Sequence, residues 1–593
     1  MRKRFFILLV TLLCHCAHFA QVNGTKPQGD QSFALSYDQV GYPALGGKFL
    51  VVNQTTDAPP PATLTLKPLL DQSPSMTIQL VPITSWESPG VKKWGALFEG
   101  AMMPGDYAIT IGEHPASQTL HVGTDGYTKV LKDVLRFYYF QRASVAIRDD
   151  HAPQRSRPLG HPDLNLKFYP VHSGATRAAP GGWYDAGDYG KYVVNAGITV
   201  ATLLSISHFA PNLIGDSSAI PESTNNKSDL LDEVKFELDW LKTMQDEKDG
   251  GVYSKVAGLY WPGMVAPERD IQDRYLFPKA TNATLNFAAV MAQAARVYQS
   301  WDPDYAKDCL VRATKAISWA LKNPNQKVPL VKDGSGNYDG GSYEDEYFWA
   351  LTELYLSTGK KLYLDYLTGK KKISGLSNIQ RLLARPDIHG PADWGMGEPP
   401  TTGVTNLAYF SILSSPENAA PIDVGAVRME LLKYGNSILE QIATNPFKVP
   451  LDRAEFVWGS NSIAANKGVV LAYAYQLSHD RKYLDGVYEI LHYLFGRNAL
   501  SMSMVTGHGF VSPRHPHHRI SGATEQLLPI PGMLIGGPNQ RKEDHLEYGP
   551  CLPEKCYLDE RASFASNEVA INWNAPLAVM LATVLNEPPS NNR

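Results

Sequence analysis

Hydrophobic and polar positions change their period once along the chain. Between residues 33 and 122, short β-branched and apolar runs alternate with turns rich in Pro, Gly and Asp, as at 48–52, 62–66 and 106–111. Runs of this length, separated by turn residues, predict β-strands. About ninety residues with this rhythm favour a small antiparallel sandwich of the immunoglobulin-like type. We place this domain at residues 31–125.

Beyond residue 128 the apolar positions recur at three- and four-residue intervals, which is the period of an amphipathic helix. The segment LLDEVKFELDWLKTM at 230–244 is the clearest case, and the same spacing returns at 284–298, 309–321, 348–356 and 469–477. Long loops rich in Gly, Pro and aromatic residues separate such segments, notably at 149–190, 386–404 and 505–556. Because long loops inside a compact domain usually carry function, we expect an all-helical domain at residues 129–590 with elaborate loops on one face.

The first twenty residues are typical of an export signal. Arg2, Lys3 and Arg4 precede an apolar run at 5–13 that is too short to span a bilayer. We therefore interpret residues 1–20 as a signal peptide. We expect a secreted protein, extracellular or periplasmic, with no membrane segment after the signal is removed.

Composition narrows the possible partners. The 593 residues carry a formal net charge of −4, which gives no general basic field for nucleic acid or anionic lipid. Thirty Tyr and eleven Trp supply flat faces that suit sugar rings, although core packing is the ordinary role of such residues. We expect a monomer that binds no nucleic acid.

The cysteines agree with export without defining a scaffold. Cys14 and Cys16 leave with the signal. Cys551 and Cys556 are close enough to close a small disulfide loop in an oxidising compartment, and the sequence leaves this open. Cys309 lies in a helical pattern, which predicts a buried free thiol.

The first motif with chemical potential is GGWYDAGDYGKY at residues 181–192. Its two carboxylates, Asp185 and Asp188, lie three residues apart among glycines and aromatic residues. Such a pair can hold a water molecule, with one member acting as general base and the other fixing the water or the base. The alternative is that both residues cap the first turn of a helix.

The second motif, HPHHR, places three histidines and Arg519 within residues 515–519. Side chains of these types could bind sugar hydroxyls or orient a carboxylate. Zinc binding is the rival interpretation, but this run has no nearby cysteine or paired carboxylate.

The third motif is YLDERASFASNEVAINWNAP at residues 557–576. Glu568 precedes an apolar helix start, and partial burial there would raise the pKa of its carboxyl and let it donate a proton. The alternative is a glutamate favoured by the dipole at a helix N-terminus.

In this order, the three motifs resemble glycoside hydrolase family nine. The similar segments are DAGDxxKY, GxNxL…PHHR at 496–519 and YxD…NEVAINWNAP, with secondary matches DEYFWA at 345–350 and WGSN at 458–461. The resemblance spans roughly residues 130–590, and the preceding sandwich resembles the immunoglobulin-like domain that one branch of the family carries. It implies an (α/α)6 barrel with an open cleft across one end.

The resemblance also implies an inverting mechanism. Asp188 corresponds to the base that activates water, Asp185 to its partner and Glu568 to the general acid. Inversion requires the acid and the base to stand roughly 6.5–9.5 Å apart, so that water fits between base and sugar.

Further residues are implied to support this site. His517 and Arg519 would bind the sugar or orient Glu568, and Asp559 would support that corner. The candidate stacking faces are Trp183, Trp458 and Trp573, with core packing as the alternative for each.

No cofactor is required for this chemistry, but some relatives carry structural metals. In those with zinc, cysteines follow a Gln-Arg pair, whereas here Gln141-Arg142 precedes Ala143, so we expect no zinc. Other relatives hold calcium near an Asp-Glu pair. The residues in that neighbourhood, our candidate calcium ligands, are Ser228, Asp229, Asp232 and Glu233. The alternative is a helix with acidic residues in its first turns.

Taken together, the sequence predicts a secreted endo-β-1,4-glucanase that acts on cellulose or a related β-glucan. One rival is an exo-acting β-glucosaminidase on chitosan oligosaccharides, an activity known from the same family. The other rival is a catalytically silent glucan-binding protein, against which the intact Asp185, Asp188 and Glu568 count.

Overall fold

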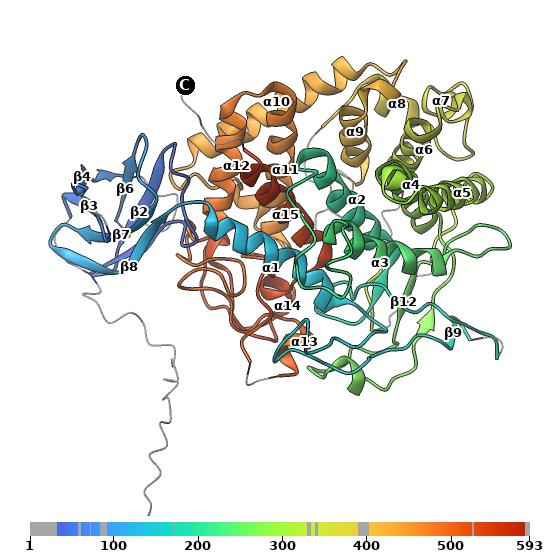
Figure 1. The fold of residues 1–593 in the computed structure, drawn as a ribbon, viewed down its shortest axis with the longest axis horizontal. Coiled ribbons are helices and arrows are strands. Elements are labelled where there is room, and N and C mark those ends of the chain that lie inside the picture. Colours follow the sequence, from blue (N-terminus) through green and yellow to red (C-terminus); the bar gives the residue numbers. More distant parts are fainter. Residues whose placement is uncertain are drawn as a thin grey trace, which may run out of the picture.

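The computed structural model describes residues 32–56, 61–70, 73–83, 92–171, 174–328, 334–338, 342–388, 403–524 and 527–587. The predicted signal peptide lies outside these ranges, as does most of the predicted loop at 386–404. Figure 1 shows strands at the N-terminal side followed by a large helical body. No helix among the described residues is long and apolar enough to cross a membrane.

The N-terminal part is a β-sandwich. One antiparallel sheet has the order β1 (Phe33–Ser36), β2 (Lys48–Gln54), β6 (Lys93–Phe98) and β5 (Val81–Pro82). The other has the order β4 (Met76–Gln79), β3 (Thr63–Pro68), β7 (Gly105–Ile111) and β8 (His114–Val122). Along β3, buried Leu64 and Leu66 alternate with more exposed neighbours, as expected for a strand with one face in a core. Both sheets contribute to one apolar core.

The helical part is an α/α barrel with two kinds of helix. One set is buried on all sides: α2 (Val193–Phe209), α4 (Thr281–Val297), α6 (Glu344–Thr358), α9 (Thr405–Ser414), α11 (Ser460–Ser478) and α15 (Ile571–Leu585). The other set is amphipathic: α1 (Asp125–Gln141), α3 (Asp229–Met244), α5 (Pro303–Ala320), α10 (Val424–Thr444) and α12 (Arg481–Leu494). A helix that is apolar all round must lie inside, and one with a single apolar stripe lies outside.

The buried helices form the inner ring of the barrel. α2 packs against α4 and α15, α4 packs against α6, α6 against α9, and α11 against α15. Between α9 and α11, the ring of Phe410 stacks on that of Tyr473 with centroids 4.1 Å apart. The five helical segments predicted from periodicity are confirmed as parts of α3, α4, α5, α6 and α11. Short helices α7 (Lys361–Leu367), α8 (Ile379–Ala384), α13 (Arg519–Gly522) and α14 (Phe564–Asn567) lie in the connections.

The predicted loop at 149–190 contains strands that the sequence did not indicate. A small sheet has the order β10 (Thr176–Arg177), β9 (Leu166–Phe168), β13 (Tyr275–Leu276), β12 (Lys255–Ala257) and β11 (Lys191–Tyr192). Because β11 leads directly into α2, this sheet fixes the segment that precedes the first inner helix.

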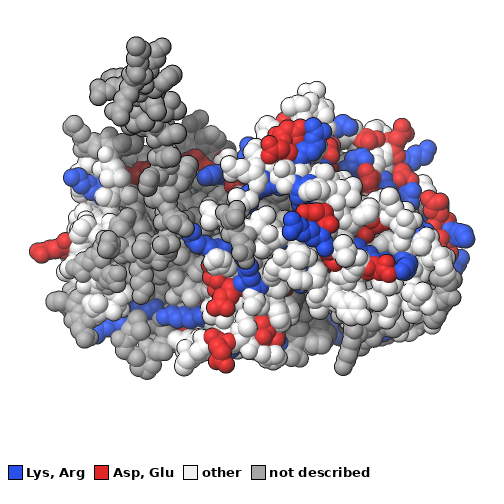
Figure 2. All heavy atoms as spheres, turned by 90° about the horizontal axis from the view of Figure 1, so that it is seen from below, with Lys and Arg blue, Asp and Glu red and all other residues white. Residues whose placement is uncertain are grey.

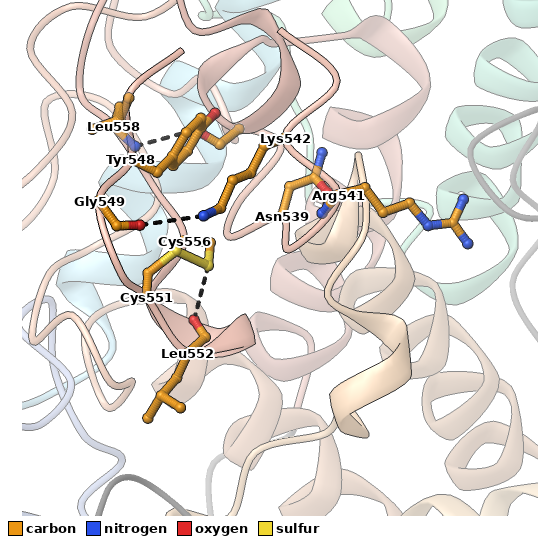
Figure 3. The surroundings of a disulfide bond; sticks show 10 residues. Asn539, Arg541, Lys542, Tyr548, Gly549, Cys551, Leu552, Cys556 and Leu558 are labelled. Atoms are coloured by element: carbon orange, nitrogen blue, oxygen red, sulfur yellow. Dashed lines mark hydrogen bonds between the residues drawn. A yellow bond between two sulfur atoms is a disulfide. The ribbon is translucent and has the colours of Figure 1, made fainter. Parts of the chain in front are cut away.

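The cysteine predictions have clear outcomes. Cys551 and Cys556 form a disulfide with Cα atoms 5.3 Å apart, which closes the loop in Figure 3. Lys542 lies beside this loop and donates a hydrogen bond to the Gly549 carbonyl at 3.3 Å. Cys309 is a buried free thiol on α5, as predicted.

A buried polar contact joins the sandwich to the barrel. Asp38 follows β1, and its Oδ2 lies 2.8 Å from His492 Nδ1 on α12 and accepts a 2.8 Å hydrogen bond from the Tyr127 hydroxyl on α1. Its Oδ1 accepts backbone hydrogen bonds from Val40 and Gly41 at 2.8 and 2.9 Å. Since Asp38 is fully buried, its loss would remove the 2.8 Å partner of His492. Tyr127 would keep its 2.6 Å hydrogen bond to the Gly41 carbonyl.

We therefore expect Asp38→Ala to lower the free energy of unfolding by about 1–3 kcal/mol, as when a buried hydrogen-bonding group loses its partner. Asp106→Ala is a matched control, because Asp106 also lies 2.8 Å from a histidine, His121, but is 50% exposed. The control should lose less than about 1 kcal/mol. Denaturant titration of both variants measures the difference, and equal losses would contradict a special role for the buried contact.

Candidate active site

The loop that carries the predicted carboxylate pair is held by a buried ion cluster. Asp163 lies under it, with Lys191 Nζ 2.7 Å from one carboxylate oxygen and Arg274 Nε 2.8 Å from the other. Lys191 also donates to the Gly181 carbonyl at 2.7 Å, and Arg274 to the Tyr189 carbonyl at 2.9 Å. Through Lys191 and Arg274, the Asp163 carboxylate thus fixes both ends of the 181–191 segment.

Asp185 and Asp188 both point their Oδ2 atoms into the protein. Asp185 Oδ2 accepts hydrogen bonds from Asn195 Nδ2 at 2.9 Å and from the Tyr338 hydroxyl at 3.3 Å. Asp188 Oδ2 accepts from the Gly190 amide at 2.9 Å and the Tyr192 hydroxyl at 3.0 Å. The buried Oδ1 of Asp185 has no hydrogen-bond partner within the described part of the chain, so it can accept one from water or substrate.

The helix-capping alternative for this pair is wrong. α2 begins at Val193, its N-cap is Tyr192, and no side chain caps it. The dipole alternative for Glu568 does not fit either, because α15 begins only at Ile571. Helix capping and the helix dipole therefore do not explain the carboxylates of either motif.

Glu568 is brought against the aspartate loop by Gly187. A Cβ atom on Gly187 would lie 2.3 Å from the His517 carbonyl oxygen and 3.2 Å from Glu568 Oε1, so only glycine fits there. Arg519 clamps the same residue, because its backbone N–H and its Nη1 donate to the Gly187 carbonyl at 3.1 and 2.7 Å. The Ile571 amide donates to the Asp185 carbonyl at 2.8 Å, which joins the two motifs on the other side.

Burial and mutual repulsion shift the pKa values of this cluster upward. Burial, and then the charge of Asp188, raise the pKa of Glu568 to about 8, while the nearby Arg519 opposes the shift. Burial and Asp188 also raise the pKa of Asp185 well above its ordinary value. Glu568 is therefore largely protonated at neutral pH, which is the state that a general acid needs.

His517 and Asp559 support this corner in different ways. His517 Nδ1 lies 2.6 Å from the Arg561 carbonyl, which identifies Nδ1 as the protonated nitrogen. Burial lowers the pKa of this imidazole to about 4, so the ring is neutral and its Nε2 is an acceptor. Asp559 accepts hydrogen bonds from the backbone amides of Arg514 and His515, each at 2.8 Å, and so orders the segment before His517.

Several residues at the site were not predicted from the sequence. The most central is Tyr338, which interacts electrostatically with Asp185, Asp188 and Glu568. Trp261 is 54% exposed and lies next to the cluster, with the Arg519 guanidinium 5.9 Å from its ring centroid. Tyr192 could have been predicted, because it ends the DAGDxxKY motif. Tyr338 and Trp261 lie in segments that carry no such motif.

Two of the three predicted stacking tryptophans are corrected. Trp183 and Trp573 are each only 1% exposed, so neither ring offers a face to a sugar. Trp183 donates its Nε1–H to Glu233 at 2.8 Å, and Trp573 packs against Gly459 and Gly536. Trp458 is half-buried, and its ring centroid is 5.2 Å from that of Phe564.

The predicted calcium ligands do not converge on one point. The Glu233 carboxylate is bound by the guanidinium of Arg142, with nitrogen–oxygen distances of 3.0–3.2 Å. Asp229 accepts from the Ser223 hydroxyl at 3.0 Å and Asp232 from Asn225 at 2.8 Å. Arg142 therefore supplies the positive charge that Glu233 requires, and the calcium site proposed at Ser228, Asp229, Asp232 and Glu233 does not fit this arrangement.

The zinc alternative at the histidine run is likewise not supported by geometry. His517 faces the Arg561 carbonyl, whereas His518 is bound at its two nitrogens by Ser521 and Gln141, both at 2.9 Å. Across the residues that the structure describes, no three His, Cys, Asp or Glu side chains are grouped to hold a metal.

Comparison with known proteins shows the family of this chain. The family model described as glycosyl hydrolase family 9 matches residues 127–581. A xyloglucan-specific endo-β-1,4-glucanase of Bacteroides ovatus is 36% identical over 513 residues, which cover 82% of this chain and 83% of that protein. A cellulose 1,4-β-cellobiosidase of Acetivibrio thermocellus is 36% identical over 522 residues, covering 79% of this chain and 57% of the larger relative.

Solved structures show the same fold over almost the whole chain. A family 9 structure from Bacteroides ovatus superposes with a TM-score of 0.80 at 32% identity, covering 93% of this chain and 98% of that one. A metagenome-derived family 9 endoglucanase superposes with a TM-score of 0.82 at 32% identity, covering 93% and 99%. The match includes the motifs that carry Asp185, Asp188 and Glu568. This chain therefore belongs to glycosyl hydrolase family 9.

Proposed function

We propose that this protein is a secreted, inverting endo-β-1,4-glucanase that hydrolyses cellulose or a related β-glucan. The observation that carries the proposal is the close approach of the buried Glu568 to the loop of Asp185 and Asp188, where burial and the charge of Asp188 raise its pKa to about 8. A protonated carboxyl group next to an ionised one is the arrangement that glycoside hydrolysis requires.

In the proposed reaction, a water molecule attacks the anomeric carbon while Asp188 accepts its proton. Asp185 fixes that water through its unpartnered Oδ1. Glu568 transfers its proton to the glycosidic oxygen as the carbon–oxygen bond breaks. After the reaction Asp188 is protonated and Glu568 ionised, and exchange with solvent restores both groups.

The substrate class rests on the aromatic rim and on the relatives. Trp261 is 54% exposed beside Arg519, and Tyr260, which precedes it in the chain, is 76% exposed. Such aromatic faces suit the apolar sides of sugar rings. The Bacteroides relative is named for xyloglucan and the Acetivibrio relative for cellulose, which share a β-1,4-glucan backbone. Neither rival hypothesis, glucosaminidase or silent glucan-binding protein, gains support from these comparisons.

The remaining features of the proposal concern partners, location and the finer fold. On the face in Figure 2, acidic and basic side chains are interspersed, which suits a neutral polysaccharide better than nucleic acid. The Cys551–Cys556 disulfide is typical of an oxidising compartment and supports secretion. We also propose that the protein is monomeric, that the sandwich is of the immunoglobulin-like type and that the barrel is of the (α/α)6 type.

Substrates with different leaving groups test the proposed role of Glu568 as the acid. We expect Glu568→Gln to lower hydrolysis of barley β-glucan by about 10²–10⁴-fold or more, because an amide cannot protonate the glycosidic oxygen. The loss should be much smaller on aryl β-glycosides with acidic phenols, which leave without a proton. Initial rates on both substrates measure this, and equal losses would argue against the acid assignment.

The pH dependence follows from the raised pKa of Glu568. Since the acid must be protonated, kcat/KM on β-glucan should fall as the pH rises through about 8. Glu568→Gln assayed on an activated aryl glycoside is the control and should lack this alkaline limb. A limb that persists unchanged in the variant would belong to another group.

Rescue by azide distinguishes the proposed roles of Asp185 and Asp188. Asp188→Asn removes the proton acceptor and should cost at least about 10²-fold, whereas Asp185→Asn should be milder because an amide still binds water. Azide attacks without a base, so it should restore turnover of an activated β-glycoside to Asp188→Asn and yield the α-glycosyl azide, detected by NMR. Rescue of Asp185→Asn instead would reverse the assignment, and a β-azide would exclude inversion.

A further inference from the structure

The barrel contains a polar cavity at the end away from the carboxylates. It has a volume of about 330 Å³ and is lined by the C-terminal turns of α2 and α4 together with residues of α9 and α11. Asp185 and Asp188 precede the N-terminus of α2, whereas Ser205 on the same helix lines this cavity. The twelve residue steps along α2 from Val193 to Ser205 correspond to roughly 18 Å, so the cavity is separate from the catalytic cluster.

An unpartnered amide oxygen marks the floor of the cavity. Gln293 on α4 is only 9% exposed, and its Nε2 donates to the Ala201 carbonyl at 3.2 Å. Its Oε1 is buried without a hydrogen-bond partner in the described part of the chain, and the side chain lines this cavity and the small space of about 20 Å³ beneath it. A buried carbonyl oxygen in this state is stabilised by any ligand that brings a donor.

The neighbouring serines also present acceptors. Ser205 donates its hydroxyl hydrogen to the Thr202 carbonyl at 2.6 Å, and Ser411 donates its own to Glu353 Oε1 at 2.5 Å. Because a hydroxyl has one hydrogen and two lone pairs, both oxygens keep acceptor capacity, although the Ser205 hydroxyl also interacts with that of Tyr473. A complementary ligand therefore carries several donors of its own.

The cavity offers no uncompensated charge. Arg296 lines it, but its guanidinium is paired with the fully buried Glu353 and also donates to Ser357 Oγ at 2.6 Å. Burial lowers the pKa of His208, the other basic residue of the lining, so that it is neutral at pH 7. This arrangement disfavours phosphates, carboxylates and cations and favours a neutral ligand.

The lining of the cavity also includes apolar side chains and one indole ring. Leu204, Leu231 and Val297 form part of the wall, and Trp301, 42% exposed, lies among the lining residues. Hydrogen-bond acceptors together with apolar side chains and an indole ring match a sugar, which carries both hydroxyl groups and apolar ring faces. The volume lies at the lower end of the range of small-molecule sites.

We propose that this cavity is a second carbohydrate site that binds a neutral sugar of one or two hexose rings. In it, the sugar hydroxyls donate to Gln293 Oε1, Ser205 Oγ and Ser411 Oγ, and a ring face lies on Trp301. The site does not depend on the proposed substrate of the catalytic end, since its lining alone defines the ligand class.

The test uses cellobiose as the probe and the full chain in the Glu568→Gln background, which prevents turnover. Calorimetric titration should show one binding event more than in the same chain with Gln293→Leu, which keeps the shape but removes the acceptor. Trp301→Ala should weaken that event at least tenfold. Phe510→Ala removes an aromatic ring that is similarly exposed, 52%, outside the cavity, and should leave the titration unchanged.

Two further measurements keep the outcome decisive. In a chain with Glu568 intact, Gln293→Leu should retain its initial rate on barley β-glucan within about twofold, which shows that folding and the catalytic end are preserved. Crystals soaked in cellobiose should show a sugar between Gln293 and Trp301. Identical titrations for Gln293→Leu and the control, or only water in the soaked cavity, would overturn the proposal.

Discussion

Repulsion among carboxylates in a water-poor site is the constraint on which the rest of the active site depends. Asp185 and Glu568 are both buried close to Asp188, and Arg519 is the cation that acts on Glu568. Two or more full negative charges cannot be kept together there at low energetic cost, so protons are retained. The high pKa of Glu568 is thus a consequence of placement, and the scaffold has to hold that placement against the repulsion it creates.

The scaffold holds the carboxylates in place with ion pairs and with hydrogen bonds from the backbone. The Asp163 cluster holds the aspartate loop through the two cations Lys191 and Arg274. Asp559 orders the segment before His517, and the first residue of α15 is bonded to Asp185. Because these groups come from distant parts of the chain, the closed barrel is what makes the site rigid.

The sequence indicated the fold class and the three carboxylates that the fold brings together, because each has a local signature. Strand and helix periods follow from the burial of one face, and the glycine-flanked DAGD and NEVAINWNAP motifs are contiguous. Contacts between residues far apart in the chain could not be predicted from the sequence. Nothing in the sequence brings Tyr338 to Asp185, 153 positions away, or Arg274 to Asp163.

Side-chain exposure was equally beyond prediction. Trp183 and Trp573 lie close in sequence to Asp185 and Glu568, yet both rings are buried in the protein interior. The neighbourhood of Ser228 to Glu233 suggested calcium, and only the fold shows that Arg142 reaches Glu233 from 91 positions away. Proximity along the chain identified the right neighbourhoods but not which face each residue presents.

The close approach at Gly187 has a consequence for how this enzyme can be varied. The loop around Gly187 and the strand-like segments at His517 and Glu568 touch without room for a methyl group, although about 330 and 380 positions separate them in the chain. Recombination between related genes at crossovers inside the barrel would join loops and acid segments from different parents. Only exchanges in which both parents keep this backbone contact at its full closeness would yield a working hybrid, so the two ends of the catalytic domain are inherited as one unit.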